Sequence, residues 1–96
     1  MATGIGTVIF NFGSAPGTNV VQTVVSDTGI SATSKVEIFM MGTDSTATHT
    51  AYEHSILPMS IALSCVSVVA ATGFTAQCAT NLRLTGTFMC RFIWAD

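Results

Sequence analysis

The sequence predicts an all-β protein, an antiparallel β-sandwich of about six short strands, folded as a single domain over residues 1–96. Three observations predict this fold class. Apolar and polar residues alternate with a period of two along most of the chain, helical periodicity is nearly absent, and turn residues recur about every 8–15 residues. A chain of 96 residues supports one domain with one modest core.

Three strands are predicted in the first half of the chain. The strand GTVIFNFG points every second side chain inward, namely Val8, Phe10 and Phe12. The turn GSAPGTN follows, because Pro16 fixes φ and Gly17 can adopt a positive φ. It leads into the β-branched strand NVVQTVVSD and the loop DTGISATS. The third strand, KVEIFMMG, places on one face Val36, Ile38 and Met40.

The second half opens with a polar segment, TDSTATHTAYEHSILP, which has weak strand character and room for one helical turn before Pro58. The fourth strand, MSIALSCVSVVA, alternates apolar and small residues and bends near residues 65–67, where the apolar phase changes. GFTAQCAT is the fifth strand, NLRLTG is a loop or edge segment, and the sixth strand spans Thr87–Ala95.

The sixth strand is apolar on both faces. One face belongs to the predicted core, which contains Phe10, Phe12, Ile38, Ile61, Leu63, Phe74, Phe88, Phe92 and Trp94. The other face carries Met89, Arg91 and Ile93, and we expect it to pack against a neighbouring subunit.

Arg91 stands in the middle of that second face. An arginine buried alone is unfavourable, because its charge cannot be lost. Either the strand lies at an edge, so that the arginine stem covers Ile93 and the guanidinium stays in water, or Arg91 pairs with a carboxylate. Glu37, on the outer face of the third strand, is one candidate partner, and across a subunit boundary such a pair would fix the register.

The composition limits the function. Charged residues make up 8% of the chain, against about 25% in typical proteins. This deficit indicates a surface that is largely covered by other subunits. Only three cationic side chains and a net charge of −2 argue against nucleic acid. No apolar run reaches the roughly 18 residues of a membrane span. The start has no basic region typical of a signal peptide, and residues 1–5 are expected to form a short N-terminal tail.

No catalytic constellation is evident, so we expect no enzyme activity and no cofactor. The three cysteines, Cys65, Cys78 and Cys90, lack metal-ligand spacing and lie in apolar strand patterns. They are predicted to be small buried residues in a reducing compartment, with a disulfide as the alternative.

The only cluster of ionisable groups is HTAYEH, which contains His49, Tyr52, Glu53 and His54. On a helix, His49 and Glu53 would share a face, whereas His54 would lie about 100° round from Glu53, unlike the arrangement of an HExxH zinc site. A weak metal hypothesis for His49, Glu53 and His54 therefore stands beside the simpler one. In the simpler hypothesis, His49, Tyr52 and His54 bond to neighbours or line a subunit contact.

Four motifs in order, GTVIFNFGSAPGTN, SKVEIFMMGTDSTATHTAYEH, TGFTAQC and LTGTFMCRFIWA, resemble a group of small proteins encoded among the structural genes of tailed bacteriophages. The resemblance covers nearly the whole chain. Phe92 stands where that group has a tryptophan, so only Trp94 matches the W-x-W-A-like end. The resemblance implies a virion protein of the head-decoration (cement) or fibre type.

The back half also resembles an H-type lectin: a strand, then G-F-T, then a terminal strand that ends in an aromatic residue and alanine. This resemblance implies a six-stranded antiparallel sandwich that assembles as a trimer and binds sugar near the trimer apex. No set of sugar-binding residues carries over to this chain.

Together these observations predict a homo-oligomeric virion protein, a trimer, that decorates the head by binding the major capsid protein or another virion protein without covalent chemistry. We expect it on the virion surface, and in the host cytoplasm during assembly. The first strand and residues 1–5 are candidates for the anchoring contact. The alternative is a carbohydrate- or receptor-binding module of a tail or fibre, with a pocket around His49, Tyr52 and His54.

Overall fold

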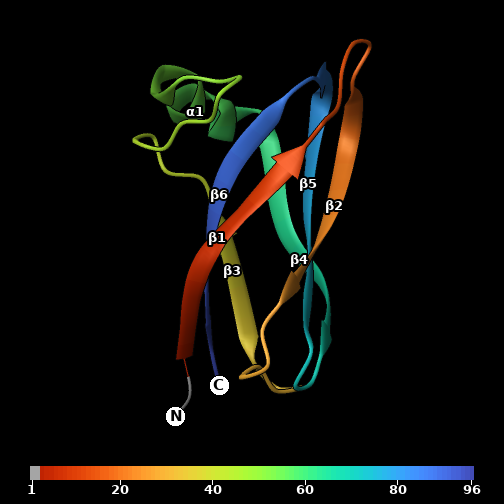
Figure 1. Ribbon diagram of the computed structural model, residues 1–96, viewed down its shortest axis with the longest axis vertical. Helices are drawn as coiled ribbons and strands as arrows, with labels where there is room; N and C mark the ends of the chain where they lie inside the picture. Colours follow the sequence, from red (N-terminus) through yellow and green to blue (C-terminus); the bar gives the residue numbers. More distant parts are fainter. Residues whose placement is uncertain (1–2) are drawn as a thin grey trace.

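The computed structural model, which describes residues 3–96, is a sandwich of two three-stranded antiparallel sheets (Figure 1). The elements in chain order are β1 (Thr3–Asn11), β2 (Thr18–Ser26), β3 (Lys35–Phe39), the helix α1 (Ala51–Ile56), a 3₁₀ turn (Leu57–Met59), β4 (Ile61–Val69), β5 (Gly73–Leu84) and β6 (Thr87–Ala95). The prediction of an all-β antiparallel sandwich with six strands is confirmed. None of the helices in residues 3–96 has the length and apolar character to cross a membrane.

Strand β6 lies at the centre of its sheet. Sheet A has the order β1-β6-β3, and sheet B has the order β2-β5-β4. β1 pairs with β6 along its whole length, from Thr3 opposite Ala95 to Asn11 opposite Thr87. β3 pairs with the other edge of β6. Of the two alternatives for Arg91, the edge strand is therefore wrong.

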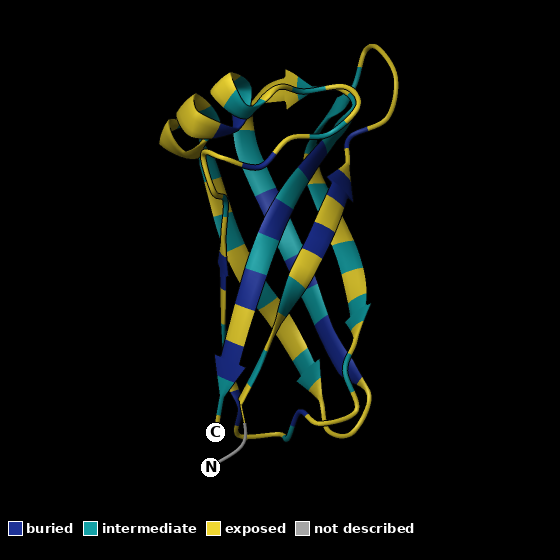
Figure 2. Cartoon of the chain, turned by 60° about the vertical axis from the view of Figure 1, so that its left-hand side comes forward, coloured by how far each residue is buried: buried dark blue, intermediate teal, exposed yellow. Residues whose placement is uncertain are grey.

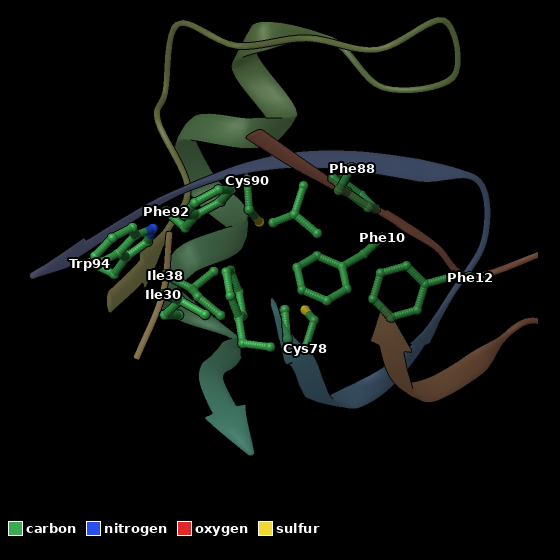
Figure 3. Packing of buried hydrophobic residues seen from close by; sticks show 12 residues of the cluster. Phe10, Phe12, Ile30, Ile38, Cys78, Phe88, Cys90, Phe92 and Trp94 are labelled. Atoms are coloured by element: carbon green, nitrogen blue, oxygen red, sulfur yellow. The ribbon is translucent and has the colours of Figure 1, made fainter. Parts of the chain in front are cut away.

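The inner faces of the two sheets meet in a core rich in aromatic rings (Figure 3). Phe74 of sheet B meets Phe92 of sheet A edge to face, with ring centroids 5.0 Å apart. Of the predicted core, seven residues are buried: Phe10, Phe12, Ile38, Phe74, Phe88, Phe92 and Trp94. Ile61 and Leu63 are only half-buried and pack against this core, because β4 is an edge strand of sheet B.

Burial alternates along the strands as the period of two predicts (Figure 2). Residues that the pattern did not single out complete the core. Ile30 enters it from the loop between β2 and β3, and Ala76 from β5. The bend predicted in the fourth strand appears as a shift of register between Cys65 and Ser67.

Two glycines of β1 make room for aromatic rings of β6. Gly4 lies opposite Trp94 and Gly6 lies opposite Phe92. A Cβ atom at Gly6 would stand 2.6 Å from Cζ of Phe92 and 2.7 Å from its Cε2. Glycine therefore lets these two rings lie flat across the backbone of β1.

Four sequence-based boundaries are wrong. Thr3, Gly4 and Ile5 belong to β1, where they pair with β6, and not to an N-terminal tail; Met1 and Ala2 lie outside the described residues. The third strand ends at Phe39. Met59 lies exposed at the end of the 3₁₀ turn Leu57–Met59, which contains Pro58, and not in the fourth strand. Residues 81–84 extend β5, since Leu84 pairs with Thr18 of β2 across a bulge.

All three cysteines are free thiols. Cys78 and Cys90 are buried in the core, and Cys65 is half-buried. Burial raises the pKa of the Cys78 thiol to about 11 and that of Cys90 to about 12. These two side chains act as small apolar core residues.

Candidate functional site

The HTAYEH segment forms the start of α1, at one end of the sandwich (Figure 1). Thr50 is the N-cap, and its hydroxyl accepts a hydrogen bond from the backbone N–H of Glu53. The Glu53 carboxylate in turn accepts from the backbone N–H of Thr50, at 2.9 Å. This reciprocal capping box explains why a short helix begins here. The bond from Thr50, followed by the one from His49, holds the pKa of Glu53 below its ordinary value.

His49 lies over Phe88 of β6. The two rings are stacked, with centroids 3.8 Å apart and planes inclined by 16°. Its Nδ1 atom is 3.1 Å from Oε2 of Glu53, and its Nε2 atom is 2.6 Å from the carbonyl oxygen of Thr85. The side chain of His49 therefore joins α1 to the turn between β5 and β6.

His54 is fully buried, with 0% exposure. Its Nδ1 atom is 2.9 Å from the carbonyl oxygen of Thr50, and its Nε2 atom accepts a hydrogen bond of 3.0 Å from the backbone N–H of Met89. The expectation that His54 lines a subunit contact is therefore wrong. The helix turns this side chain toward its own β6, while Tyr52 points into solvent and stays accessible.

The weak metal hypothesis is not supported by this geometry. Both ring nitrogens of His49 and of His54 already have protein partners. Within residues 3–96 no three His, Cys, Asp or Glu side chains are placed to hold a metal ion. His49, Glu53 and His54 fasten α1 to the sandwich.

Arg91 pairs with Asp44, from the loop after β3, and not with Glu37. Nε and Nη2 of Arg91 donate to the two carboxylate oxygens at 2.9 and 2.8 Å. The Asp44 side chain is 8% exposed and that of Arg91 is 41% exposed. These hydrogen bonds hold the pKa of Asp44 below its ordinary value, against the opposing effect of burial. Glu37 of β3 lies opposite Ile93 of β6, whereas Phe39 lies opposite Arg91.

The outer face of sheet A is an apolar surface around this ion pair. Cross-strand pairing sets its rows: Ile5, Ile93 and Glu37 in one, Thr7, Arg91 and Phe39 in the next, and Ile9 with Met89 in the third. Of these apolar residues, Met89 is half-buried and the others are exposed, most of all Ile5 at 79%. A shallow hollow of about 200 Å³ lies between Ile5, Phe39, Arg91 and Ile93.

The outer face of sheet B is almost uncharged. Arg83, near the end of β5, is the only charged residue in its three strands. Gln22 and Gln77 form a hydrogen bond of 2.8 Å across the face, and Val24 beside them is 74% exposed. This face therefore carries less charge than the outer face of sheet A, which has Lys35, Glu37 and Arg91.

A wider depression of about 530 Å³ lies at the α1 end of the sandwich. Its wall combines polar side chains with glycine, alanine and other apolar surface, and the polar side chains are those of Asn11, Ser14, Thr48, His49, Thr85 and Thr87. Of the pocket predicted around His49, Tyr52 and His54, only His49 contributes. Tyr52 lies outside this depression, and His54 is inside the protein.

Comparison with known proteins adds no identity: no family model matches the chain, and neither does any curated protein or any solved structure.

Proposed function

We propose that this chain is a homo-oligomeric structural protein of a tailed-bacteriophage particle, a trimer that decorates the head by binding the major capsid protein. The observation that carries the proposal is the apolar outer face of sheet A. An exposed apolar patch of this kind marks an interaction surface more often than a free surface. The resemblance of four ordered sequence motifs to phage virion proteins supports the choice of particle.

The proposed subunit contact uses Met89, Arg91 and Ile93 together with Ile5, Ile9 and Phe39 of the flanking strands. Burial of an exposed isoleucine contributes about 1.5–3 kcal/mol by transfer, before the entropy of association is subtracted. The Arg91–Asp44 pair neutralises the one cation in the centre of this face. His49 and Tyr52 lie at the α1 end and belong to the rim of the proposed contact.

The proposal has no catalytic step. The decoration protein clamps neighbouring capsid subunits non-covalently, and its place is the virion surface after assembly in the host cytoplasm. Strand β1, which forms an edge of sheet A, is the proposed anchor to the capsid.

Size-exclusion chromatography with light scattering tests the contact, with and without EDTA. Wild-type protein is expected to elute as a trimer that EDTA does not change. Ile5→Lys places a charge on the apolar face, on its edge strand β1, and is expected to give a folded monomer. A wild-type protein that stays monomeric at micromolar concentration would contradict the proposal.

Val24→Lys is the matched control, because Val24 is about as exposed as Ile5 but lies on sheet B. If sheet A alone makes the contact, Val24→Lys leaves the oligomer intact. If sheet A of one subunit instead packs on sheet B of the next, Val24→Lys dissociates the oligomer. Co-sedimentation with capsids of the phage that encodes the chain then tests binding to the major capsid protein.

The second candidate function is carbohydrate or receptor binding by a tail or fibre module. The depression at the α1 end favours it, because hydroxyl and amide groups in its wall, including those of Asn11, Thr48 and Thr85, could form hydrogen bonds with a sugar. A glycan array, followed by saturation-transfer NMR on wild type and Thr85→Ala, tests this candidate. Binding that the alanine variant loses would favour it over decoration.

A further inference from the structure

The ring of Phe88 contacts two histidines that need opposite protonation states. His49 stacks on it at 3.8 Å, and the centroid of His54 is 5.3 Å away. We propose that these two histidines form a pH-sensitive latch that holds α1 against β6 near neutral pH and releases it in acid. The latch follows from the contacts within one chain and does not depend on the proposed function.

His54 must be neutral in the closed state. Its Nδ1 faces a carbonyl oxygen, which only accepts, so Nδ1 carries the hydrogen. Its Nε2 faces the backbone N–H of Met89, which only donates, so Nε2 carries none. Protonation of His54 would place two donors face to face at 3.0 Å inside the protein.

His49 has the opposite requirement. Its Nδ1 faces the carboxylate of Glu53 and its Nε2 faces the carbonyl of Thr85. Both partners accept, so His49 makes both hydrogen bonds only as the imidazolium ion. The closed latch therefore makes all four of these hydrogen bonds only with one charged and one neutral histidine, and both rings contact Phe88.

Of the ionisable groups around His54, neither the carboxylates nor the buried thiol changes its protonation between pH 7 and 5. Asp44 faces it from the loop after β3, but Arg91 of β6 neutralises that carboxylate through two hydrogen bonds. Glu53 of α1 is turned to Thr50 and His49. The thiol of Cys90 on β6 stays neutral, because burial raises its pKa. Both carboxyls have lowered pKa values, so neither titrates between pH 7 and 5.

Protonation of His54 separates α1 from β6 at the Met89 amide without opening the sandwich, while His49 keeps its bonds to Glu53 and Thr85. Met89 loses its acceptor at the amide, while the strand pairs of sheets A and B do not involve either histidine. Met89 also belongs to the outer face of sheet A. When its amide loses the bond to His54, the end of β6 near Met89 is held less firmly.

Hydrogen exchange measured by NMR on the full chain tests this proposal. Protection of the Met89 amide, corrected for intrinsic exchange, is expected to fall at least about tenfold from pH 7.5 to 5, while core amides of β5 keep theirs. In His54→Gln the amide side chain can donate to Thr50 and accept from Met89 without a change of charge, so protection of the Met89 amide should no longer depend on pH. His49→Gln is the control, and in this variant protection of the Met89 amide should still fall in acid.

Constant Met89 protection in the wild type over this range would overturn the latch. So would an acid response that survives His54→Gln and disappears in His49→Gln. Nitrogen chemical shifts of the wild-type imidazoles provide a test that needs no variant. The neutral form of His54 should carry its hydrogen on Nδ1, and a neutral form with the hydrogen on Nε2 would refute the assignment.

Discussion

Gly6→Ala is the sharpest test of how the core is packed. The new Cβ would lie 2.6 Å from Cζ of Phe92, so the ring would have to retreat by about 0.8 Å to reach an ordinary 3.4 Å contact. It has little room, because Phe92 is buried and meets Phe74 edge to face at 5.0 Å. The strain must therefore be absorbed by the backbone of β1 or by the core.

The expected effect is the difference of two terms. Overpacking of a well-packed core costs about 1–3 kcal/mol. Replacement of glycine by alanine inside a strand returns about 0.5–1 kcal/mol through the unfolded chain. We therefore expect Gly6→Ala to lower the free energy of unfolding by about 1–2 kcal/mol, which corresponds to about 4–8 °C in Tm for each kcal/mol at this size.

Urea denaturation followed by circular dichroism measures this difference. Gly29→Ala is the matched control, since a Cβ at Gly29 meets nothing closer than an ordinary contact of 3.5 Å and its φ is not positive. It should be neutral or slightly stabilising. In a Phe92→Leu background, Gly6→Ala should lose much of its effect. If Gly6→Ala is as stable as Gly29→Ala, or if its effect is unchanged in that background, the packing argument is wrong.

Other predictions concern the ion pair and the thiols. Arg91→Met should lower stability at pH 7, because it leaves the buried carboxylate of Asp44 without its two hydrogen bonds; urea denaturation measures the loss, and equal stability would contradict it. Since the pKa of Asp44 is lowered in the folded protein, the pair stabilises fully above the ordinary carboxyl pKa of 3.8 and stops doing so as pH falls through the lowered value. The difference between wild type and Arg91→Met should therefore be constant from pH 7 to 5 and shrink below about pH 4, and a constant difference down to pH 2 would refute the assignment. Iodoacetamide at pH 8 should modify Cys65 in the native protein but Cys78 and Cys90 only after unfolding, as mass spectrometry would reveal, because burial raises the pKa of the latter two to about 11 and 12. Rapid native labelling of all three would contradict this.

The period of two was enough to predict the strands and their inner faces. In β1 and β6 it located Val8, Phe10, Phe88, Phe92 and Trp94, because each side chain's face depends only on its neighbours along the strand. The same local information could not reveal which strands pair. The first strand joins the last, and nothing in the spacing of either specifies that partner.

The candidate site was harder to predict. Asp44 and Arg91 are 47 positions apart and meet because the loop after β3 folds back over β6. Opposite charges alone do not identify the partner of Arg91, because Glu37 has the same charge as Asp44 and lies in a predicted strand. His54 was misplaced because the helix phase alone does not say which side of α1 meets the sandwich. The capping box T-x-x-E at Thr50 was visible in the sequence and marks where the helix begins.

The central place of β6 sets the order in which the chain can fold during synthesis. Sheet B is built from strands that leave the ribosome before β6 does. β1 and β3 have no hydrogen-bonded neighbour in sheet A other than β6, so the first strand waits with its apolar side uncovered until the last one emerges. At about 5–20 residues per second this interval lasts several seconds. We expect the nascent chain to hold sheet B as an incomplete half and to depend on chaperones until Thr87–Ala95 inserts between its two partners.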